Sequence, residues 1–521
     1  MTIWYVRPDA SHGGSNKGTS FDNAWQGWAS LVWAGAGIVA GDTLYLCGAH
    51  TSTSSLSFGA HGATSTANKF TLRGDYAPSP GTVTFSGTGF FNVTRQWTTI
   101  QRLTVNGMAG FSCILGTLVS GFVVDQCTLV GGSNGVGLSS TTAFRDATIS
   151  NNIIHGQTIA GINHSIVTAS IVASGITIRG NTIYGSSLYG ILLAINSTGW
   201  TTSTFADYKI QNNTVYDCAG SSIYARSCHN DLTTFPTVYS PGLVVSGNTV
   251  YDCGTIAGAS GNHGGLSITG FANPLITNNV VRDSYVTGGG IQTAKNKSPT
   301  IALNTVHGIR SGTPTVAYQN GLPIDGNGIF FDNLTIGGVA FGNRVYDLVT
   351  TGNVGSGAGL AVWDCSDVKF TGNVVTGCAC GAMYGRNTES GNMFYHNTFV
   401  SCTVGVAKVG VGALAGNVIV KNNIFKNCTT GFSIGANPGI TADYNCVNGS
   451  TTAYSGISAG ANDLSIDPSL DSAYRPQNPH LKRAGIYLGG KDYNGKQFYN
   501  PPNIGAVDDL TSTPRYLLLS R

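Results

Sequence analysis

Short segments in which apolar and polar residues alternate recur along most of the chain. They are three to five residues long and are separated by Gly, Asn and Ser. Six of them carry Gly at or near their start: YGILL at 189–193, GGLSI at 264–268, GGIQT at 289–293, NGIFF at 327–331, AGLAV at 358–362 and TGFSI at 430–434. Since alternation with a period of two is typical of strands, the pattern predicts a chain built of many short strands joined by tight turns.

A second regularity is an asparagine followed by a pair of β-prone residues. Its two most similar copies read NTVYDC, at 213–218 and 248–253. The asparagines are Asn152, Asn181, Asn213, Asn248, Asn279, Asn304, Asn343, Asn373, Asn397, Asn423 and Asn445, and earlier copies without Asn lie at Leu103 and Cys127. Their spacing varies from 22 to 39 residues. A parallel β-solenoid tolerates such variation, because loops leave one corner without moving the next coil, whereas sandwiches and propellers fit it less well.

Stacked coils would place equivalent side chains ~4.8 Å apart in ladders. An Asn ladder could satisfy the backbone groups that a tight corner leaves open. Five positions after the Asn lie Cys218, Cys253, Cys378, Cys402 and Cys428. We therefore expect a column of small buried thiols, not a metal cage. The aspartates of the same corner, Asp217, Asp252, Asp283 and Asp347, are expected to be scaffold as well.

The ends of the chain depart from the repeat. We expect residues 1–95 to form an N-terminal cap with the first strands, helical over 24–36, because a solenoid end exposes unpaired backbone groups. Residues 96–454 should form the β-helix body, of about 11–14 coils. Residues 455–521 should form an irregular closing segment, whose final TPRYLLLSR is suited to contacts between chains.

Composition narrows the classes of function. The formal net charge is +3, only 10% of residues are charged, and Glu389 is the only glutamate. We expect no nucleic-acid binding, because runs of Lys or Arg are missing, and no membrane insertion, because the apolar stretches are short. The start resembles no signal peptide, so the chain should be made in a cytoplasm with reduced thiols. No cofactor or metal site is expected from the spacing of potential ligands.

Functional residues are expected where one coil differs from its neighbours. Long spacings predict extra loops at 226–241, 308–328 and 350–357, in the middle of the solenoid. Successive second strands place Tyr224, Ser267, Gln292, Phe330 and Ala361 outward. Two to three positions further come Arg226, Thr269, Lys295, Asp332, Trp363, Asp364 and Arg386. A Trp with charges of both signs suits a sugar site.

We predict Asp332, Asp364, Lys295 and Arg386 as catalytic residues, and Trp363, Tyr224, Arg226, Gln292, Phe330 and His263 as substrate-binding residues. Asp332 and Asp364, on adjacent coils, could stand ~5 to 9 Å apart as in glycosidases, with one as the proton donor. For a lyase, Lys295 or His263 would abstract the C5 proton, while Arg226 or Arg386 neutralises the uronate. The structural alternative is that Asp332 caps a turn and that Asp364 belongs to the repeat.

The chain resembles the right-handed parallel β-helix, or pectate-lyase-like, superfamily. YVRPDASHGGSNKGTSFDNAW followed by GDTLYLCG resembles the opening of bacterial and phage members, and the string from DPSL through AGIYLGGKDYNG to PPNIGAVDD resembles their closing segment. The resemblance implies polysaccharide lyases, glycoside hydrolases, epimerases or bacteriophage tailspikes. The polygalacturonase signature is incomplete, because no Asp-Asp pair precedes NHGGLSITG at 262–270, which contains His263.

The sequence therefore predicts an all-β right-handed parallel β-helix, most like a phage tailspike that cleaves a bacterial capsular polysaccharide or lipopolysaccharide. Hydrolysis is favoured over β-elimination by a polysaccharide lyase. A non-catalytic carbohydrate-binding adhesin or structural spike is the alternative from another class. The resemblance implies a homotrimer in the virion tail, made in the host cytoplasm, or otherwise an extracellular bacterial protein.

Overall fold

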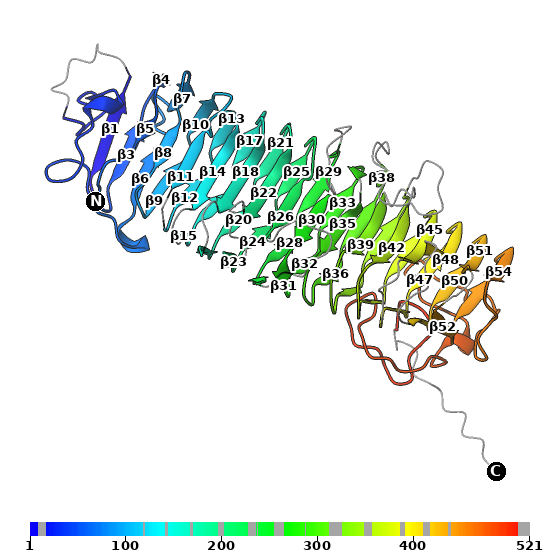
Figure 1. Cartoon of the computed structure of the whole chain (residues 1–521). Coiled ribbons are helices and arrows are strands. Elements are labelled where there is room, and N and C mark those ends of the chain that lie inside the picture. The colour runs from blue at the N-terminus through cyan, green and yellow to red at the C-terminus, as the bar shows by residue number, and fades with distance from the viewer. Residues whose placement is uncertain are drawn as a thin grey trace.

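The chain is a right-handed parallel β-helix, seen as an elongated rod of stacked coils in a computed structural model (Figure 1). The structure describes residues 1–8, 17–117, 120–140, 144–166, 170–195, 203–227, 236, 238–254, 265–286, 288–311, 326–348, 357–385, 391–409, 417–435 and 439–508. The chain starts at one end of the rod and advances coil by coil toward the other. The fold predicted from the repeat is thus confirmed.

Three long parallel sheets run the length of the rod, and we call them sheets 1, 2 and 3 in the order in which a coil visits them. Sheet 1 contains β2 (Trp25–Gln26), β1 (Ile3–Arg7), β3 (Thr43–Leu46), β6 (Phe70–Arg73), β9 (Thr98–Gln101), β12 (Val123–Asp125), β16 (Thr148–Ser150), β20 (Thr177–Arg179), β24 (Lys209–Gln211), β28 (Val244–Ser246), β32 (Leu275–Thr277), β36 (Thr300–Ala302), β40 (Val339–Phe341), β43 (Lys369–Thr371), β46 (Met393–Tyr395), β49 (Val418–Lys421) and β52 (Ile440–Asp443).

Sheet 2 follows the corner that carries the register asparagines. It contains β4 (Ala49–Ser52), β7 (Thr82–Phe85), β10 (Thr104–Gly107), β13 (Thr128–Gly131), β17 (Ile153–His155), β21 (Thr182–Tyr184), β25 (Thr214–Tyr216), β29 (Thr249–Tyr251), β33 (Val280–Arg282), β37 (Thr305–His307), β41 (Arg344–Tyr346), β44 (Val374–Thr376), β47 (Thr398–Val400), β50 (Ile424–Lys426) and β53 (Cys446–Asn448).

Sheet 3 completes each coil. It contains β5 (Leu56–Ser57), β8 (Phe91–Val93), β11 (Ile114–Thr117), β14 (Asn134–Ser140), β18 (Ala160–Ile166), β22 (Tyr189–Ile195), β26 (Ile223–Arg226), β30 (Leu266–Thr269), β35 (Gly289–Ala294), β39 (Asn327–Asp332), β42 (Ala358–Trp363), β45 (Cys380–Gly385), β48 (Val404–Val409), β51 (Thr430–Ser433) and β54 (Thr452–Ser455).

Short elements lie at the corners and ends. Three small sheets contain β15 (Phe144–Arg145), β19 (Val172–Ser174) and β23 (Thr204–Ala206); β27 (Ser240–Pro241) and β31 (Phe271–Ala272); and β34 (Tyr285–Val286) and β38 (Arg310–Ser311). The helices described are 3-10 turns: η1 (Trp28–Ser30), η2 (Thr66–Asn68) and η3 (Pro479–Leu481). Among the described residues, no helix is long and apolar enough to cross a bilayer.

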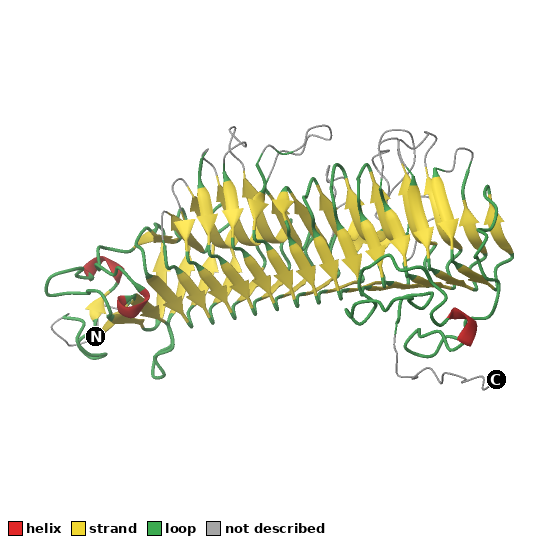
Figure 2. Cartoon of the chain, turned by 90° about the horizontal axis from the view of Figure 1, so that it is seen from below, coloured by secondary structure: helices red, strands yellow, loops and turns green. Residues whose placement is uncertain are grey.

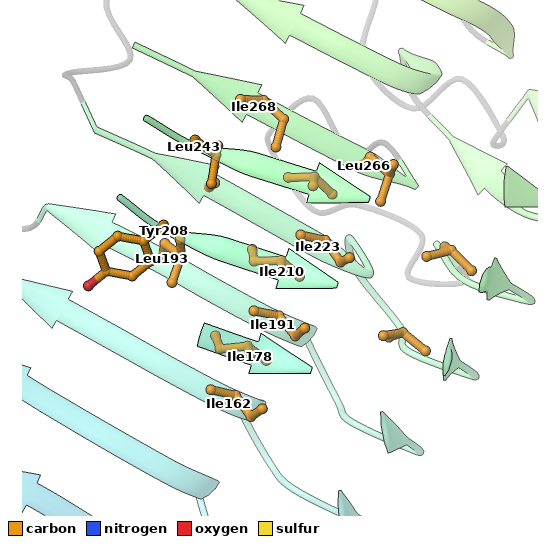
Figure 3. Close-up of a cluster of buried hydrophobic side chains, with 14 of the residues drawn as sticks. Ile162, Ile178, Ile191, Leu193, Tyr208, Ile210, Ile223, Leu243, Leu266 and Ile268 are labelled. Atoms are coloured by element: carbon orange, nitrogen blue, oxygen red, sulfur yellow. The ribbon is translucent and has the colours of Figure 1, made fainter. Parts of the chain in front are cut away.

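The core consists of columns of like side chains. Ile178 and Ile210 of sheet 1 pair in register, and Ile191 pairs with Ile223 in sheet 3; all four are fully buried (Figure 3). Burying each such side chain contributes ~1.5–3 kcal/mol of hydrophobic free energy. Because the period of two sends every second residue outward, the same strands also determine which side chains reach the outer face.

The register asparagines form a continuous hydrogen-bonded ladder at the corner between sheets 1 and 2. The Oδ1 of Asn248 accepts hydrogen bonds from the backbone N and the Nδ2 of Asn213, both at 3.0 Å. Its own Nδ2 donates to Ile210 O at 2.9 Å and to Asn279 Oδ1 at 2.9 Å. The pattern repeats from Asn152 to Asn445. This is the ladder that the sequence predicted.

The eleven cysteines within the described residues are free and buried. Burial raises the pKa of the Cys127 and Cys380 thiols to about 12. These thiols therefore remain protonated at neutral pH and act as small apolar side chains. The predicted column of thiols is confirmed: its members are free and buried, Cys218 interacts with Cys253, and Cys402 interacts with Cys378 and Cys428.

The N-terminal cap differs from the expected helix over 24–36. This stretch forms β2, the single turn η1 and an irregular bend in which Gly27 and Ala34 have φ of 70° and 65°. Its tryptophans cover the first coils instead: Trp25 stacks on Trp4, with centroids 4.9 Å apart, and Trp33 packs edge-on against Phe70 at 5.5 Å. The helix-like apolar spacing therefore reflects rings that seal the end of the core. Strand stacking is continuous across residue 95, since β6 pairs with β9.

The described part of the closing segment folds back against the outside of the last coils (Figure 2). Ile486 exchanges hydrogen bonds with Asn422, and Ala506 N donates to Thr398 Oγ1 at 2.9 Å. His396 is fully buried beneath the segment: its ring stacks on Phe498, with centroids 4.0 Å apart, and its Nδ1 lies 3.2 Å from Asn503 O. The segment thus covers the corner that carries the Asn ladder in these coils.

Candidate functional site

The outer face of sheet 3 carries the side chains that break the repeat. Pairing places Tyr224, Ser267, Gln292, Phe330 and Ala361 opposite one another on successive strands, as the sequence predicted. Two positions later a second column contains Arg226, Thr269, Ala294 and Asp332. The inward neighbours, such as Ile291 and Ile329, are fully buried in the core. Sheet 3 therefore brings most of the candidate residues to one face.

Asp332 is at the centre of a buried polar cluster on this face. It is 5% exposed, and its Oδ2 accepts hydrogen bonds from Gln292 Nε2 and Asn333 Nδ2, each at 3.0 Å. Its Oδ1 accepts one from Asn333 N at 2.8 Å. N–H donors on both oxygens stabilise the charged form of a carboxylate. Asp332 is thus held in a fixed position with both oxygens engaged.

Gln292 supports this carboxylate. It is 1% exposed, and its Nε2 donates to Asp332, while its buried Oε1 accepts no hydrogen bond from the described part of the chain. A Cβ placed on Gly288 would come within 2.2 Å of that oxygen, so Gly288 provides the space the amide occupies. Gln292 was predicted to bind substrate, and the structure places it in contact with Asp332. That hydrogen bond was not visible from the sequence.

Lys295 and Asp364 lie in the corner after the sheet 3 strands, not in the column of Asp332. They have φ of 52° and 51°, and the column position before Lys295 is Ala294. Lys295 thus lies three positions after Gln292, whereas Asp332 lies two positions after Phe330, and both fall within the range of two to three positions expected from the sequence. Lys295 is 3% exposed and Asp364 is half-buried. The two corner residues belong to the coils before and after Asp332.

The corner between them contains an extra residue. Ala294 pairs with Asp332 and Lys297 pairs with Ile336. Lys297 lies three positions after Ala294, but Ile336 lies four positions after Asp332, so the coil of Asp332 has one more residue in this corner. The insertion leaves Asn333 and Leu334 with positive φ, at 36° and 59°. Left-handed backbone at a leucine costs roughly 1–2 kcal/mol, and such strain concentrates at functional sites. The bulge turns Asn333 so that both its backbone and side chain reach Asp332.

An apolar cluster lies beside the polar one on the same outer face. It contains Phe330, Trp363 and Met383, which are 3%, 6% and 0% exposed. A Cβ on Gly385 would lie 2.7 Å from the Trp363 indole, so the ring packs across that glycine on the neighbouring strand. In this arrangement Phe330 and Trp363 support the site and present little open ring surface.

Two predicted substrate-binding residues, Tyr224 and Arg226, are half-exposed and lie on β26, several coils before Asp332. Tyr224 stacks on Tyr189 of the preceding coil, with centroids 5.5 Å apart and planes at 14°. The Arg226 guanidinium lies 5.9 Å from the Tyr224 ring centroid. Burial raises the pKa of Tyr189, and the nearby Arg226 opposes that shift. Tyr189, which was not among the residues predicted from the sequence, is the first residue of β22 and directly precedes Gly190.

His263 and Arg386, predicted as binding and catalytic residues, lie outside the described residues, as do Glu389 and most of the loops expected at 308–328 and 350–357. Within the described ranges, no group of three or more His, Cys, Asp or Glu side chains is arranged to hold a metal ion.

Comparison with known proteins relates the chain to a family by sequence. A family model described as "Right handed beta helix region" matches residues 88–235 and 200–413, which together span more than half of the chain. No curated protein matches the sequence.

Several solved structures are similar to the chain at low sequence identity. The A-module of mannuronan C-5 epimerase AlgE6 from Azotobacter vinelandii is 14% identical over 80% of this chain and 91% of its own, with a TM-score of 0.39. The GH136 lacto-N-biosidase from Eubacterium ramulus is 12% identical over 89% of this chain and 68% of its own, at 0.36. The enzymatically active domain of tailspike protein 2 from bacteriophage CBA120 is 15% identical over 64% of this chain and 43% of its own, at 0.34.

Proposed function

This chain belongs to the right-handed β-helix family, and we propose that it binds and cleaves a bacterial surface polysaccharide on the outer face of sheet 3. The observation that carries the proposal is the Gln292–Asp332–Asn333 cluster. A carboxylate held by three N–H donors beside a strained bulge is not required by the repeat, since the two preceding coils have Ala294 and Thr269 at this position. Such departures are typical of functional sites.

We propose hydrolysis with Asp332 and Asp364 as the two carboxyl groups. Asp332, with donors on both oxygens, suits the role of the charged group that activates water or stabilises positive charge on the sugar. Asp364, half-buried in the corner of the next coil, suits the proton donor.

Tyr224 and Arg226 are the proposed contacts for the glycan, because both are half-exposed on the face that leads to Asp332. Arg226 would favour a sugar with an acidic group. The other three predicted contacts would act indirectly. Gln292 would position Asp332 through its hydrogen bond, and the packing of Phe330 and Trp363 would hold the strands of this face in place.

A lyase is the second candidate, and Lys295 favours it. A buried lysine in the corner next to Asp332 is a candidate base for abstraction of a C5 proton, while Arg226 would neutralise the uronate. His263 and Arg386 stay predictions for the same two roles. A third candidate is a non-catalytic adhesin or structural spike that uses the face only for binding.

We further propose that the protein is a tailspike-like homotrimer in a phage virion, with an extracellular bacterial protein as the alternative. The proposal rests on the resemblance of the two ends of the chain to phage members and on the apolar terminal residues 513–521.

Purified protein incubated with a panel of bacterial capsular polysaccharides and lipopolysaccharides tests the three candidates. New reducing ends without an unsaturated product support the hydrolase. Ultraviolet absorbance of an unsaturated uronate indicates the lyase, and binding without cleavage indicates the adhesin. Asp347→Asn is a matched control, because Asp347 also occupies a positive-φ corner but lies at the end of sheet 2.

A further inference from the structure

The duplicated NTVYDC motif has an inner and an outer half. Asn213, Val215 and Cys218 are at most 1% exposed, and their counterparts Asn248, Val250 and Cys253 are equally buried. The core therefore accounts for the inner half. Thr214 and Tyr216 are half-exposed and Asp217 is exposed, and the same holds for Thr249, Tyr251 and Asp252. Nothing in the core requires the outer half to be identical on two coils.

These outer halves form a regular stripe along sheet 2. The rings of His155, Tyr184, Tyr216 and Tyr251 stack on consecutive strands β17, β21, β25 and β29, which lie side by side in Figure 1. Successive centroids are 4.8, 5.0 and 4.9 Å apart, with planes at 6°, 8° and 3°. The Arg282 guanidinium, 4.2 Å from the Tyr251 centroid, ends the stack. We call the three tyrosines with their flanking residues Thr182, Thr214, Thr249, Asp217 and Asp252 the tyrosine stripe.

The stripe repeats a common set of polar groups from coil to coil. Each rung has a threonine hydroxyl and a phenol, and the last two rungs add a carboxylate. Desolvation, neighbouring phenols and the Asp217 carboxylate raise the pKa of Tyr216, so its O–H remains a donor at neutral pH. Because the rings stack on one another, their position is fixed before any ligand arrives, which lowers the entropy lost on binding.

We propose that the tyrosine stripe is a second, non-catalytic binding face for a linear glycan of neutral or amino sugars lying along the axis of the rod. A ladder of identical groups at the coil repeat matches a ligand that is itself a repeating chain, and a hexose unit in an extended glycan advances by a similar length. Hydroxyls, phenols and carboxylates are the partners that sugar hydroxyls and ammonium groups require. Asp217 and Asp252 would repel a polyanion, so the face differs in specificity from the Arg226 side of sheet 3.

The described closing segment leaves this stripe uncovered. Its contacts with the outer side chains of sheets 1 and 2, such as Lys491 over Phe341 and Tyr474 near Arg344, lie on later coils. The stripe is also on a different sheet from Asp332. Binding at one face therefore does not require activity at the other.

Affinity electrophoresis of the full chain in native gels tests the proposal, with hydroxyethylcellulose as the neutral polymer, glycol chitosan as the amino-sugar polymer and alginate as the polyanion. We expect retardation by the first two and none by alginate. The double variant Y216F/Y251F keeps the ring stack and removes two hydroxyls, and it should weaken retardation about tenfold. D217N/D252N should selectively weaken binding to glycol chitosan.

Y346A is the matched control, because Tyr346 stacks on His307 at 4.5 Å on the same sheet but outside the stripe. It should bind like the parent, and so should D332N, which separates this proposal from the one for sheet 3. Equal retardation of the parent and Y216F/Y251F, retardation only by alginate, or no retardation in any gel would overturn the proposal. Self-association that the double variant abolishes would assign the stripe to a second copy of the chain and would also overturn it.

Discussion

At the scale of the residue, position in the coil decides what an aspartate does. Asp217, Asp252 and Asp364 occupy corners with φ between 51° and 52°, where a short polar side chain tolerates left-handed backbone. Asp332 lies instead on the outer face and accepts three hydrogen bonds. The register indicated which residues depart from the repeat. Gln292 was predicted as a substrate contact, but its hydrogen bond to Asp332 could not be predicted, because it depends on side-chain geometry between two coils. The bulge at Asn333 could not be predicted either, because it depends on a one-residue insertion in the corner after the strand.

Replacing Asp332 by Asn should lower kcat/KM by about 10²–10⁴-fold, because a neutral amide cannot accept a proton or stabilise positive charge. Asp364→Asn should have a loss of similar size if it is the proton donor. Melting curves of both variants check that folding is retained, and Asp347→Asn should leave activity unchanged. Full activity in both site variants would show that the carboxylates are assigned wrongly.

Gln292→Ala should reduce activity less than Asp332→Asn, by about tenfold, since it removes one hydrogen bond and leaves the carboxylate in place. Its effect should fall mainly on kcat, because Gln292 acts through Asp332 and is 1% exposed. Steady-state kinetics on a cleaved glycan separate kcat from KM. A rise in KM alone would indicate that Gln292 contacts the substrate directly.

At the scale of the element, the ladders make each coil depend on its neighbours. Asn248→Ala removes four hydrogen bonds and leaves buried backbone groups without partners, so it should cost about 2–4 kcal/mol of unfolding free energy. Asn448→Ala, at a half-exposed outer position of β53, should change it by less than about 0.5 kcal/mol. Urea titrations followed by circular dichroism provide the comparison, and equal losses would contradict a structural role of the ladder.

Docking of the closing segment should weaken in acid through His396. Burial lowers the pKa of His396 to about 3, and the unfolded value is near 6.5. The contribution of neutral His396 to the free energy of unfolding is therefore complete above pH 6.5 and is lost as the pH falls toward 3. The loss is about 3 kcal/mol at pH 4.5. Protonation would place an N–H of the ring against the Asn422 amide, whose Nδ2 lies 3.1 Å from His396 Nε2.

Melting temperatures at pH 7.5 and 4.5 test this in parent and His396→Gln proteins. The parent should lose more stability than the variant between the two values. The comparison with the variant is needed because two buried aspartates respond to pH in the opposite way. Burial raises the pKa of Asp492 and Asp508, so these two groups stabilise the fold more as the pH falls. Parallel losses in both proteins would contradict the role of His396.

At the scale of the whole molecule, the fold follows from the repeat. One Asn per coil specified the corner, and the Gly-initiated strands specified sheet 3, so the solenoid and the column from Tyr224 to Ala361 were predictable. The helix expected over 24–36 was wrong, because Trp25 and Trp33 cover the core end and are not one face of a helix. The spacing of apolar residues alone cannot distinguish a helix from an irregular segment whose aromatic side chains pack on the same core.

Assembly is a property of the whole chain and stays a prediction. Sedimentation velocity should give three times the chain mass of 53.9 kDa, and removal of residues 513–521 should weaken the assembly. A monomer at micromolar concentration would contradict a homotrimer.

The most direct measurement of the central claim is product analysis after incubation with the glycan panel, with parent and Asp332→Asn proteins side by side. Hydrolysis at Asp332 should give new reducing ends on at least one glycan, no unsaturated uronate, and loss of those ends in the variant. Cleavage that the variant retains, an unsaturated product, or binding without cleavage across the panel would contradict hydrolysis at the outer face of sheet 3.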